Sequence, residues 1–320
     1  MKCYRCCIIA FFSFLTVAAP KAQADVIAVN DKVSVQRLHI PRVHAGTSPF
    51  YNYVVELLQM TVDATSDQYG KAVLVANAEP TVQERQLRNL QDKYLDVTWS
   101  VTTFQRERYS QAIYVPIAGG LFGKRLAIIR KNDFRFDSPL PLNTLQKLTA
   151  VQEESWPDTT ILRSSGFNVI GAPYQPAFKM LEKKFVDYYP RGVLEIGYEL
   201  ENPLYTALTL EPHLVIVYPS AMFFFVSKNN ILLAARLRKG LDILIENGEL
   251  QHLLHSQEFY QHAQEQLKSR VQYIIPNHLL SDAAQQAYQH YIPLISKQNY
   301  LKKEAINDGL QEAPALVGKQ

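Results

Sequence analysis

The stretch PIAGGLFGKRL, residues 116–126, decides how the chain is divided. It contains one proline and three glycines, and these two residue types interrupt helices and strands more strongly than any others. A second interruption lies at Pro219, roughly a hundred residues further along the chain. Two interruptions at this separation predict two lobes, the first of which is discontinuous in sequence and is completed after the second.

Before the first interruption, strand and helix patterns alternate. Residues 33–40, 72–76 and 96–101 are β-rich or apolar runs that predict strands. A first helix face is marked by Phe50, Tyr53, Val54, Leu57, Leu58 and Thr61. A second helix face is marked by Leu87, Leu90 and Tyr94. This alternation predicts parallel βαβ units with both faces of the sheet covered.

A second α/β set follows the interruption. Its predicted strands are residues 125–130, 149–151, 167–170, 193–196, 214–218 and 222–226. Its helix faces carry Phe178, Leu181 and Phe185, and then Leu233, Leu237, Leu241, Leu244 and Ile245. Asn247-Gly248 ends the long helix, because Gly tolerates the left-handed C-terminal position. We therefore predict an α/β fold of two lobes, each a mostly parallel sheet flanked by helices.

The two interruptions predict lobe 1 at residues 25–117 and 218–275 and lobe 2 at residues 118–217. Residues 276–320 are predicted to form a C-terminal helical extension and tail, and residues 1–24 a signal peptide. Within the extension, a helix is expected from about Ser281 to Tyr291.

The N-terminus has the pattern of a secretory leader. Lys2 and Arg5 precede the apolar run 8–19, and Ala22 and Ala24 supply small residues before a cleavage point. We expect a cleaved signal peptide and a periplasmic protein. The cysteines all lie inside the leader: Cys3, Cys6 and Cys7. Their Cys-x-x-Cys spacing is therefore not expected to serve metal or redox chemistry.

Net charge limits the class of partner. Removing residues 1–24 lowers the formal charge from +3 to zero. A neutral chain argues against a general nucleic-acid binder, whose affinity depends on neutralising phosphates. No segment after the leader approaches the ~20 apolar residues needed to cross a bilayer. We expect a monomer that binds a small molecule.

Local strings add a family resemblance. Residues 96–99 (DVTW) followed by 103–108 (TFQRER) resemble a strand-then-helix segment of the type 2 periplasmic solute-binding proteins, whose best-known members deliver polar amino acids to ABC transporters. More narrowly, the chain is similar to a subgroup of bacterial exported proteins that has no assigned ligand. The strings shared with that subgroup are residues 116–117, 119–123, 125–126, 156–159, 161–162, 187–188, 190–192, 195, 212–213 and 218–219.

The resemblance implies that Thr103 and Arg108 face the ligand. A guanidinium offers a planar fork of donors that binds two oxygens of an anion at once, which makes Arg108 the expected anchor. The alternative is an ordinary surface arginine. Thr103 either donates its hydroxyl to the ligand or caps the following helix.

Residues 155–159 follow the strand predicted at 149–151, where a helix begins. Free N–H groups at a helix N-terminus favour an anion, so we expect Ser155, Trp156 and Asp158 to contact the ligand, with Trp156 as an aromatic wall. In the alternative, Ser155 is the N-cap, a proline occupies the first turn, and Asp158 complements the helix dipole.

Arg191 is a departure from the amino-acid-binding relatives. The resemblance implies that an acidic residue in this region holds the ammonium of an amino acid, and an arginine would repel that group. We therefore expect a more anionic solute, bridged by Arg108 and Arg191. The alternative is that Arg191 pairs with Glu195 or Glu199 and never reaches the cleft.

Further aromatic and titratable residues complete the set. Tyr51 and Trp99 are candidate cleft residues, although aromatics at this spacing are more often core. His252 and His255 are weak metal ligands because no third ligand accompanies them. We expect no metal, no cofactor and no catalytic residue.

No nucleophile, zinc or phosphate-loop motif occurs in the sequence. The predicted function is extracytoplasmic binding of a small polar, anionic organic solute between two lobes whose closure is recognised by an ABC permease. One alternative is a stand-alone sensory binding protein for a membrane receptor. A dehydratase-like enzyme, with Glu195 and His213 as acid and base, is the less favoured alternative.

Overall fold

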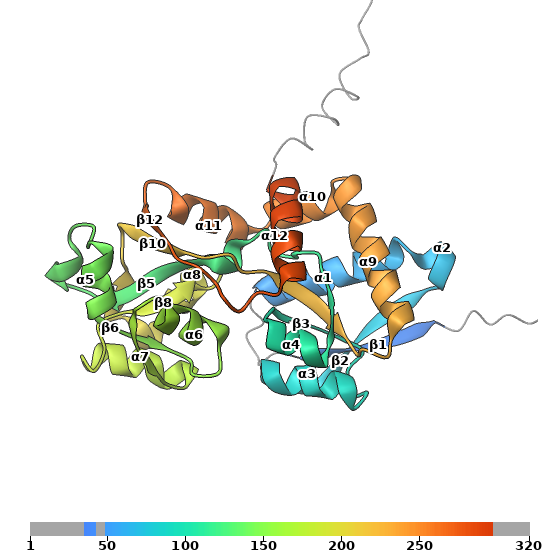
Figure 1. Cartoon of the computed structure of the whole chain (residues 1–320), viewed down its shortest axis with the longest axis horizontal. Helices are drawn as coiled ribbons and strands as arrows, with labels where there is room; N and C mark the ends of the chain where they lie inside the picture. The colour runs from blue at the N-terminus through green and yellow to red at the C-terminus, as the bar shows by residue number, and fades with distance from the viewer. Residues whose placement is uncertain (1–34, 43–48, 297–320) are drawn as a thin grey trace, which may run out of the picture. The chain divides into compact units, whose positions relative to one another are not determined.

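The computed structural model of the protein describes residues 35–42 and 49–296. The predicted signal peptide, the cysteines and the tail from residue 297 lie outside the described residues. Within the described ranges, no helix combines the length and apolar content needed to cross a membrane. Most of the elements described below are labelled in Figure 1.

Lobe 1 is built on two small sheets. β1 (Gln36–Arg42) pairs in parallel with β2 (Ala72–Pro80). β11 (Met222–Val226) lies between β3 (Val97–Val101) and β4 (Gln111–Ile113) and runs antiparallel to both. The helices of this lobe are α1 (Pro49–Asp63), α2 (Ser66–Tyr69), α3 (Gln83–Gln91), α4 (Phe104–Tyr109), α9 (Ile231–Glu246), α10 (Glu249–His255) and α11 (Glu258–Leu267).

The helical periodicity of lobe 1 is confirmed. All six residues predicted on the first helix face are buried in α1. The five predicted on the long helix are buried in α9, which ends at Glu246, immediately before the predicted Asn-Gly pair. Burial of these stripes is the main stabilisation of such helices, because helical propensity alone is weak in water.

Lobe 2 is built around β5. Its main sheet contains β5 (Lys124–Arg130), β8 (Tyr189–Gly192), β9 (Leu208–Leu210), β10 (Leu214–Val217) and β12 (Val271–Ile274). A second, two-stranded sheet pairs β6 (Thr149–Gln152) in parallel with β7 (Asn168–Gly171). The helices are α5 (Leu142–Lys147), α6 (Pro157–Ser164), α7 (Tyr174–Glu182) and α8 (Ile196–Leu200), with short 3₁₀ turns at Leu121–Gly123, Phe134–Phe136 and Pro203–Tyr205.

Two of the chain segments that connect the lobes lie against each other. Residues 114–123 lead from β4 to β5, and residues 218–221 lead from β10 to β11. The N–H of Tyr218 donates to the carbonyl oxygen of Gly123 at 2.9 Å. A Cβ at position 123 would lie 1.9 Å from the carbonyl oxygen of Tyr218, so this close approach requires glycine. Most of the sequence 116–126 thus lies in the segment that connects β4 to β5.

The C-terminal part of the chain contributes to both lobes. β12 pairs in parallel with β10, although the predicted boundaries placed residues 271–274 in lobe 1. α12 (Asp282–Ile295) confirms the predicted C-terminal helix, and the hydroxyl of Ser281 caps it by accepting from the N–H of Ala284 at 3.1 Å. The segment before α12 touches lobe 1, because the N–H of Phe104 donates to the carbonyl oxygen of Leu279 at 2.8 Å.

Some details differ from the sequence-based expectation. The sheets are mixed rather than mostly parallel: within the described ranges, three strand pairs are parallel and five are antiparallel. The strand predicted at 193–196 is wrong, since β8 ends at Gly192 and Ile196 begins α8. Tyr94 and Phe185 lie beyond the ends of α3 and α7 and are 67% and 71% exposed.

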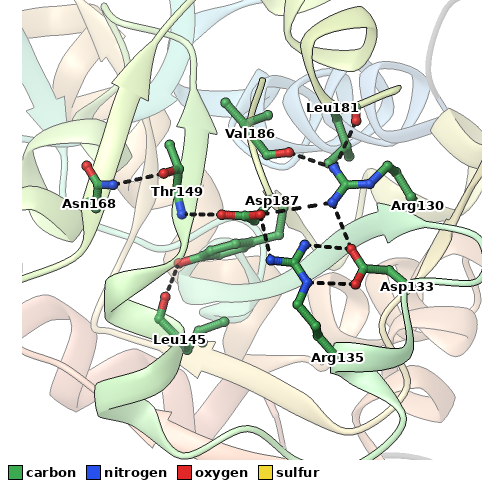
Figure 2. Close-up of polar contacts among 10 residues, drawn as sticks. Arg130, Asp133, Arg135, Leu145, Thr149, Asn168, Leu181, Val186 and Asp187 are labelled. Atoms are coloured by element: carbon green, nitrogen blue, oxygen red, sulfur yellow. Dashed lines mark hydrogen bonds and ion pairs between the residues drawn. The ribbon is translucent and has the colours of Figure 1, made fainter. Parts of the chain in front are cut away.

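Four charged residues of lobe 2 form a cluster that we call the loop-side cluster: Arg130, Asp133, Arg135 and Asp187 (Figure 2). Asp133 accepts from Arg130 Nη2 at 2.8 Å and from Arg135 Nη2 at 2.7 Å. Arg135 Nη1 donates to Asp187 Oδ1 at 2.8 Å. Further bonds join the cluster to backbone groups of Thr149, Leu181 and Val186. The cluster therefore fastens β5, β6 and the end of α7 to one another.

Candidate functional site

A pocket of about 630 Å³ is lined by residues of both lobes. Lobe 1 contributes α3 and the start of α4, and lobe 2 contributes the segment that leads into α6. The lining residues are Glu84, Leu87, Arg88, Gln91, Thr103, Phe104, Gln105, Arg106, Tyr109, Glu154, Ser155, Trp156, Pro157, Thr160 and Leu279. This volume falls in the range of small-molecule sites, about 300–1,000 Å³.

Arg106 is the arginine that α4 directs to the pocket. Thr103 is the N-cap of α4, and its hydroxyl accepts from the N–H of Arg106 at 3.1 Å. The guanidinium donates through Nη1 to Ser100 Oγ at 2.6 Å and to the carbonyl oxygen of Val101 at 2.7 Å. Burial lowers the pKa of Arg106, because its charge is poorly solvated, while Asp158 and Glu84 favour the charge. An anion in the pocket would compensate this desolvation.

Arg108, the predicted anchor, is exposed and is not one of the lining residues. Successive helical residues are rotated by about 100°, so Arg108 lies on the opposite side of α4 from Arg106. Thr103 lines the pocket and is also the cap, so both alternatives for it remain compatible with the structure. Ligand contact by Arg108 and Thr103 stays a prediction.

The start of α6 is arranged differently from the predicted cap. The N-cap residue is Trp156 rather than Ser155, and Pro157 occupies the first helical position as expected. The N–H and hydroxyl of Ser155 both donate to Glu153 Oε2, at 3.1 and 2.5 Å. Ser155 and Trp156 line the main pocket.

Asp158 is buried in a second cluster of charged residues, which we call the pocket-side cluster: Arg125, Asp158, Arg191, Glu195 and Glu199. Arg125 Nη2 lies 2.5 Å from Asp158 Oδ1. The hydroxyl of Tyr218 contacts the same carboxylate and accepts from Arg125 Nε at 2.9 Å. Arg125, Asp158 and Glu195 line a small pocket of about 50 Å³, which shares Trp156 with the main pocket.

Arg191 lies in this cluster and is 1% exposed. Its Nη2 lies 2.5 Å from Glu199 Oε1 and 3.2 Å from Glu195 Oε2. The centre of its guanidinium lies 4.6 Å from the ring centroid of Trp156. The alternative in which Arg191 pairs with Glu195 and Glu199 therefore describes its position, and Arg191 does not line the main pocket. Its contact with a ligand stays a prediction.

The two remaining aromatic candidates lie together in lobe 1. Trp99 is 7% exposed on β3, and its ring centroid lies 5.6 Å from that of Tyr51. The hydroxyl of Tyr51 donates to the carbonyl oxygen of Pro41 at 3.1 Å. Neither residue lines the main pocket.

Sequence reasoning did not single out several lining residues: Glu84, Leu87, Arg88, Phe104, Arg106 and Leu279. The available signal for Arg106 was Thr103 as an N-cap, because the cap residue and the third helical residue share a face. No local sequence pattern indicates Leu279, because it is far from α4 in sequence and the two meet only in the folded chain.

The described residues give little support to a metal site or to the Glu195–His213 acid–base pair. Among the described residues, no group of three His, Cys, Asp or Glu side chains is placed to hold a metal ion. His255 stacks on Tyr260 with ring centroids 4.5 Å apart, and burial lowers its pKa. His213 and Glu195 line different pockets, so the structure does not bring this acid–base pair together at one pocket.

The fold is that of the two-lobed periplasmic binding proteins, and comparisons with known structures show it. The extracellular-binding protein ytmK of Bacillus subtilis, a probable amino-acid ABC transporter component, has a TM-score of 0.53 and 14% identity, over 71% of this chain and 99% of its own. The periplasmic VFT2 domain of Bordetella pertussis BvgS has a TM-score of 0.51 and 16% identity, over 70% and 93%. An arginine-specific periplasmic binding protein of Salmonella typhimurium has a TM-score of 0.50 and 15% identity, over 72% and 99%.

No protein-family model and no curated protein matches the sequence. At identities this low, the structural likeness establishes the fold alone. The neighbours are binding proteins, and binding of a small ligand fits this fold.

Proposed function

We propose that the protein binds a small polar organic anion in the 630 Å³ pocket, as an extracytoplasmic solute-binding protein. The observation that carries this proposal is the pocket itself, to which both lobes contribute and into which α4 directs Arg106. Contacts from both lobes stabilise a closed form, since a ligand shifts a conformational equilibrium only through differential affinity.

The charge balance of the pocket favours an anion. Glu154 is neutralised by Arg163, with Nη1–Oε1 and Nη2–Oε2 distances of 2.8 and 2.9 Å. The remaining charged lining residues are Glu84, Arg88 and Arg106, which leaves one net positive charge. Arg106 donates to protein oxygens only through Nη1 within the described residues. Its Nε and Nη2 therefore remain available for a carboxylate.

Arg191 is not part of this proposal. Its charge is balanced by Glu199 and Glu195, so it supplies no uncompensated positive charge. The sequence-based argument against ammonium-bearing solutes depended on that charge. We therefore assign the anion anchor to Arg106 alone and leave an additional ammonium on the solute open to test.

The partner in the proposal is an ABC permease in the inner membrane, which recognises the closed form. Its support is the likeness in fold to the probable ABC transporter component of B. subtilis. A sensory receptor is the alternative partner. Permease and ATPase genes beside this gene support import, whereas a neighbouring signalling gene supports sensing.

A thermal-shift screen of refolded, ligand-stripped protein tests the proposal. Organic anions, neutral sugars and cationic amines are compared at equal concentration. A ligand selective for the native state raises stability by RT ln(1 + [L]/Kd), about 2.7 kcal/mol at 100 Kd. Organic anions should give the largest rise in Tm. A screen in which neutral or cationic solutes give the largest rise contradicts the proposal, and turnover of the bound compound would point to an enzyme instead.

A further inference from the structure

Three of the residues that line the pocket are aromatic. Phe104 and Tyr109 approach it from α4, and Trp156 approaches it from the start of α6. Phe104 is 46% exposed and Tyr109 is 64% exposed. No residue of α4 is buried, so these two rings do not belong to a core. Large apolar side chains gathered at a concave surface are characteristic of a ligand site.

Trp156 is held in place by the pocket-side cluster. The Arg191 guanidinium lies against its ring, with 4.6 Å between guanidinium centre and ring centroid. Arg191 is fixed in turn by Glu199, to which Nε donates at 2.9 Å and Nη2 at 2.5 Å. The ring of Tyr174 also contacts Trp156, with centroids 6.0 Å apart. Trp156 is therefore a pre-organised wall, which lowers the entropic cost of binding against it.

Aromatic surface and positive charge occur in the same pocket. Phe104, Arg106 and Tyr109 all belong to α4, and all three line this pocket. Leu87 and Pro157 extend the apolar lining. A ligand that uses both features has an anionic group for Arg106 and a flat apolar body for the rings.

We propose that the solute is an aromatic carboxylate of one or two rings, whose carboxylate pairs with Arg106 and whose ring contacts Phe104, Tyr109 and Trp156. This proposal rests on the proposed function, because it places the solute in the same pocket. Aromatic pairs gain stabilisation beyond the area they bury, and the gain corresponds to roughly two- to tenfold in affinity. A saturated acid of the same size and charge lacks this gain.

The test measures Kd by isothermal titration calorimetry for benzoate, cyclohexanecarboxylate and succinate. The first two probes differ in planarity and aromaticity at equal charge and similar size. The variants are Phe104→Leu and Tyr109→Leu, which keep an apolar side chain and remove the ring. The matched control is Phe134→Leu, because Phe134 is 77% exposed and does not line the main pocket. Tm without added probe shows whether each variant is folded.

Benzoate should bind roughly two- to tenfold more tightly than cyclohexanecarboxylate. Phe104→Leu and Tyr109→Leu should each reduce this preference, and Phe134→Leu should leave it unchanged. Equal or tighter binding of cyclohexanecarboxylate or succinate, or a preference that both pocket variants retain, overturns the aromatic assignment.

The same titrations separate this inference from the proposed function. If succinate binds best and Arg106→Ala abolishes its binding, the aromatic proposal fails and the anion-binding proposal stands. If none of the three acids binds, the aromatic proposal fails, and the screen of organic anions decides the proposed function. If Arg106→Ala leaves binding intact, both proposals fail.

Discussion

Lobe 2 contains two clusters in which arginines meet carboxylates, and they differ in charge balance and burial. The loop-side cluster has two arginines and two aspartates, and the side chain of Arg135 is 44% exposed. The pocket-side cluster has two arginines and three acids. Its central pair is deeply buried, with the side chains of Arg191 and Glu199 2% and 3% exposed.

The two clusters also differ in what they bond to. The loop-side cluster is tied to backbone groups of three segments and acts as a fastening (Figure 2). The pocket-side cluster is tied mainly to side chains, and Arg191 Nη1 is buried without a hydrogen-bond partner among the described residues. An unpaired buried donor is costly. Arginine–carboxylate pairs thus hold backbone segments together in the loop-side cluster, and they position Trp156 in the pocket-side cluster.

Removing one partner of the buried pair should have the largest effect. Glu199→Gln leaves the Arg191 charge buried with only Glu195 near it, and such a loss costs about 3–5 kcal/mol. Urea denaturation gives the change in unfolding free energy. Glu195→Gln is the control and should cost clearly less, because Glu195 is 25% exposed and Arg191 keeps Glu199. Equal costs for the two variants would contradict the central place of the Arg191–Glu199 pair.

Breaking the loop-side cluster should cost less and should depend on pH. Hydrogen bonds from Arg135 lower the pKa of Asp133 below its usual 3.8. A depressed pKa stabilises the fold above the unfolded-state pKa, and this contribution is lost as pH falls through the folded-state pKa. Asp133→Asn should therefore cost about 1.5–3 kcal/mol at pH 7.

Denaturation at several pH values provides the check. The difference between wild type and Asp133→Asn should shrink as the pH falls below about 4, because the wild-type carboxyl then becomes neutral too. A difference that stays constant down to pH 2 would show that the charge of Asp133 is not what the cluster uses.

Replacing Trp156, which forms a wall of the pocket, should have the smallest effect on stability. Trp156→Leu removes the ring that lies against Arg191. Because Trp156 is partly exposed while Arg191 is buried, the lost cation–π contact should cost about 1–2 kcal/mol. Thermal denaturation should accordingly show a small drop in Tm, whereas benzoate affinity falls. A large loss of stability would instead make Trp156 a core residue and would remove it from the pocket wall.

Much of the fold could be predicted because it follows from the local spacing of apolar residues and from the positions of Gly and Pro. α1 and α9 follow from apolar spacing, and the glycine-rich connecting segment follows from residues that interrupt regular structure. The strand β8 lies at Tyr189–Gly192 rather than at 193–196, and Pro190 and Gly192 weaken the local strand pattern there. Its hydrogen bonds come from β5, far away in sequence.

The site could be predicted only in part for the same reason. The start of α6 follows a strand, which predicts a site there, and Ser155 and Trp156 line the pocket. The resemblance predicts Arg108 from its spacing to Thr103, whereas the cap of α4 places Arg106 on the pocket side. The burial of Arg191 depends on Glu199 and the aromatic rings around it, and no pattern in the sequence shows that they meet.

The most direct test of the account compares two arginines of α4, one facing the pocket and one facing away. Arg106→Ala and Arg108→Ala are titrated with the anion that gives the largest rise in Tm, after both variants are shown to be folded. Arg106→Ala should weaken binding at least tenfold, since a hydrogen bond to a charged group contributes about 1.5–3 kcal/mol, and Arg108→Ala should leave Kd unchanged. Loss of binding in Arg108→Ala with retention in Arg106→Ala would contradict the account.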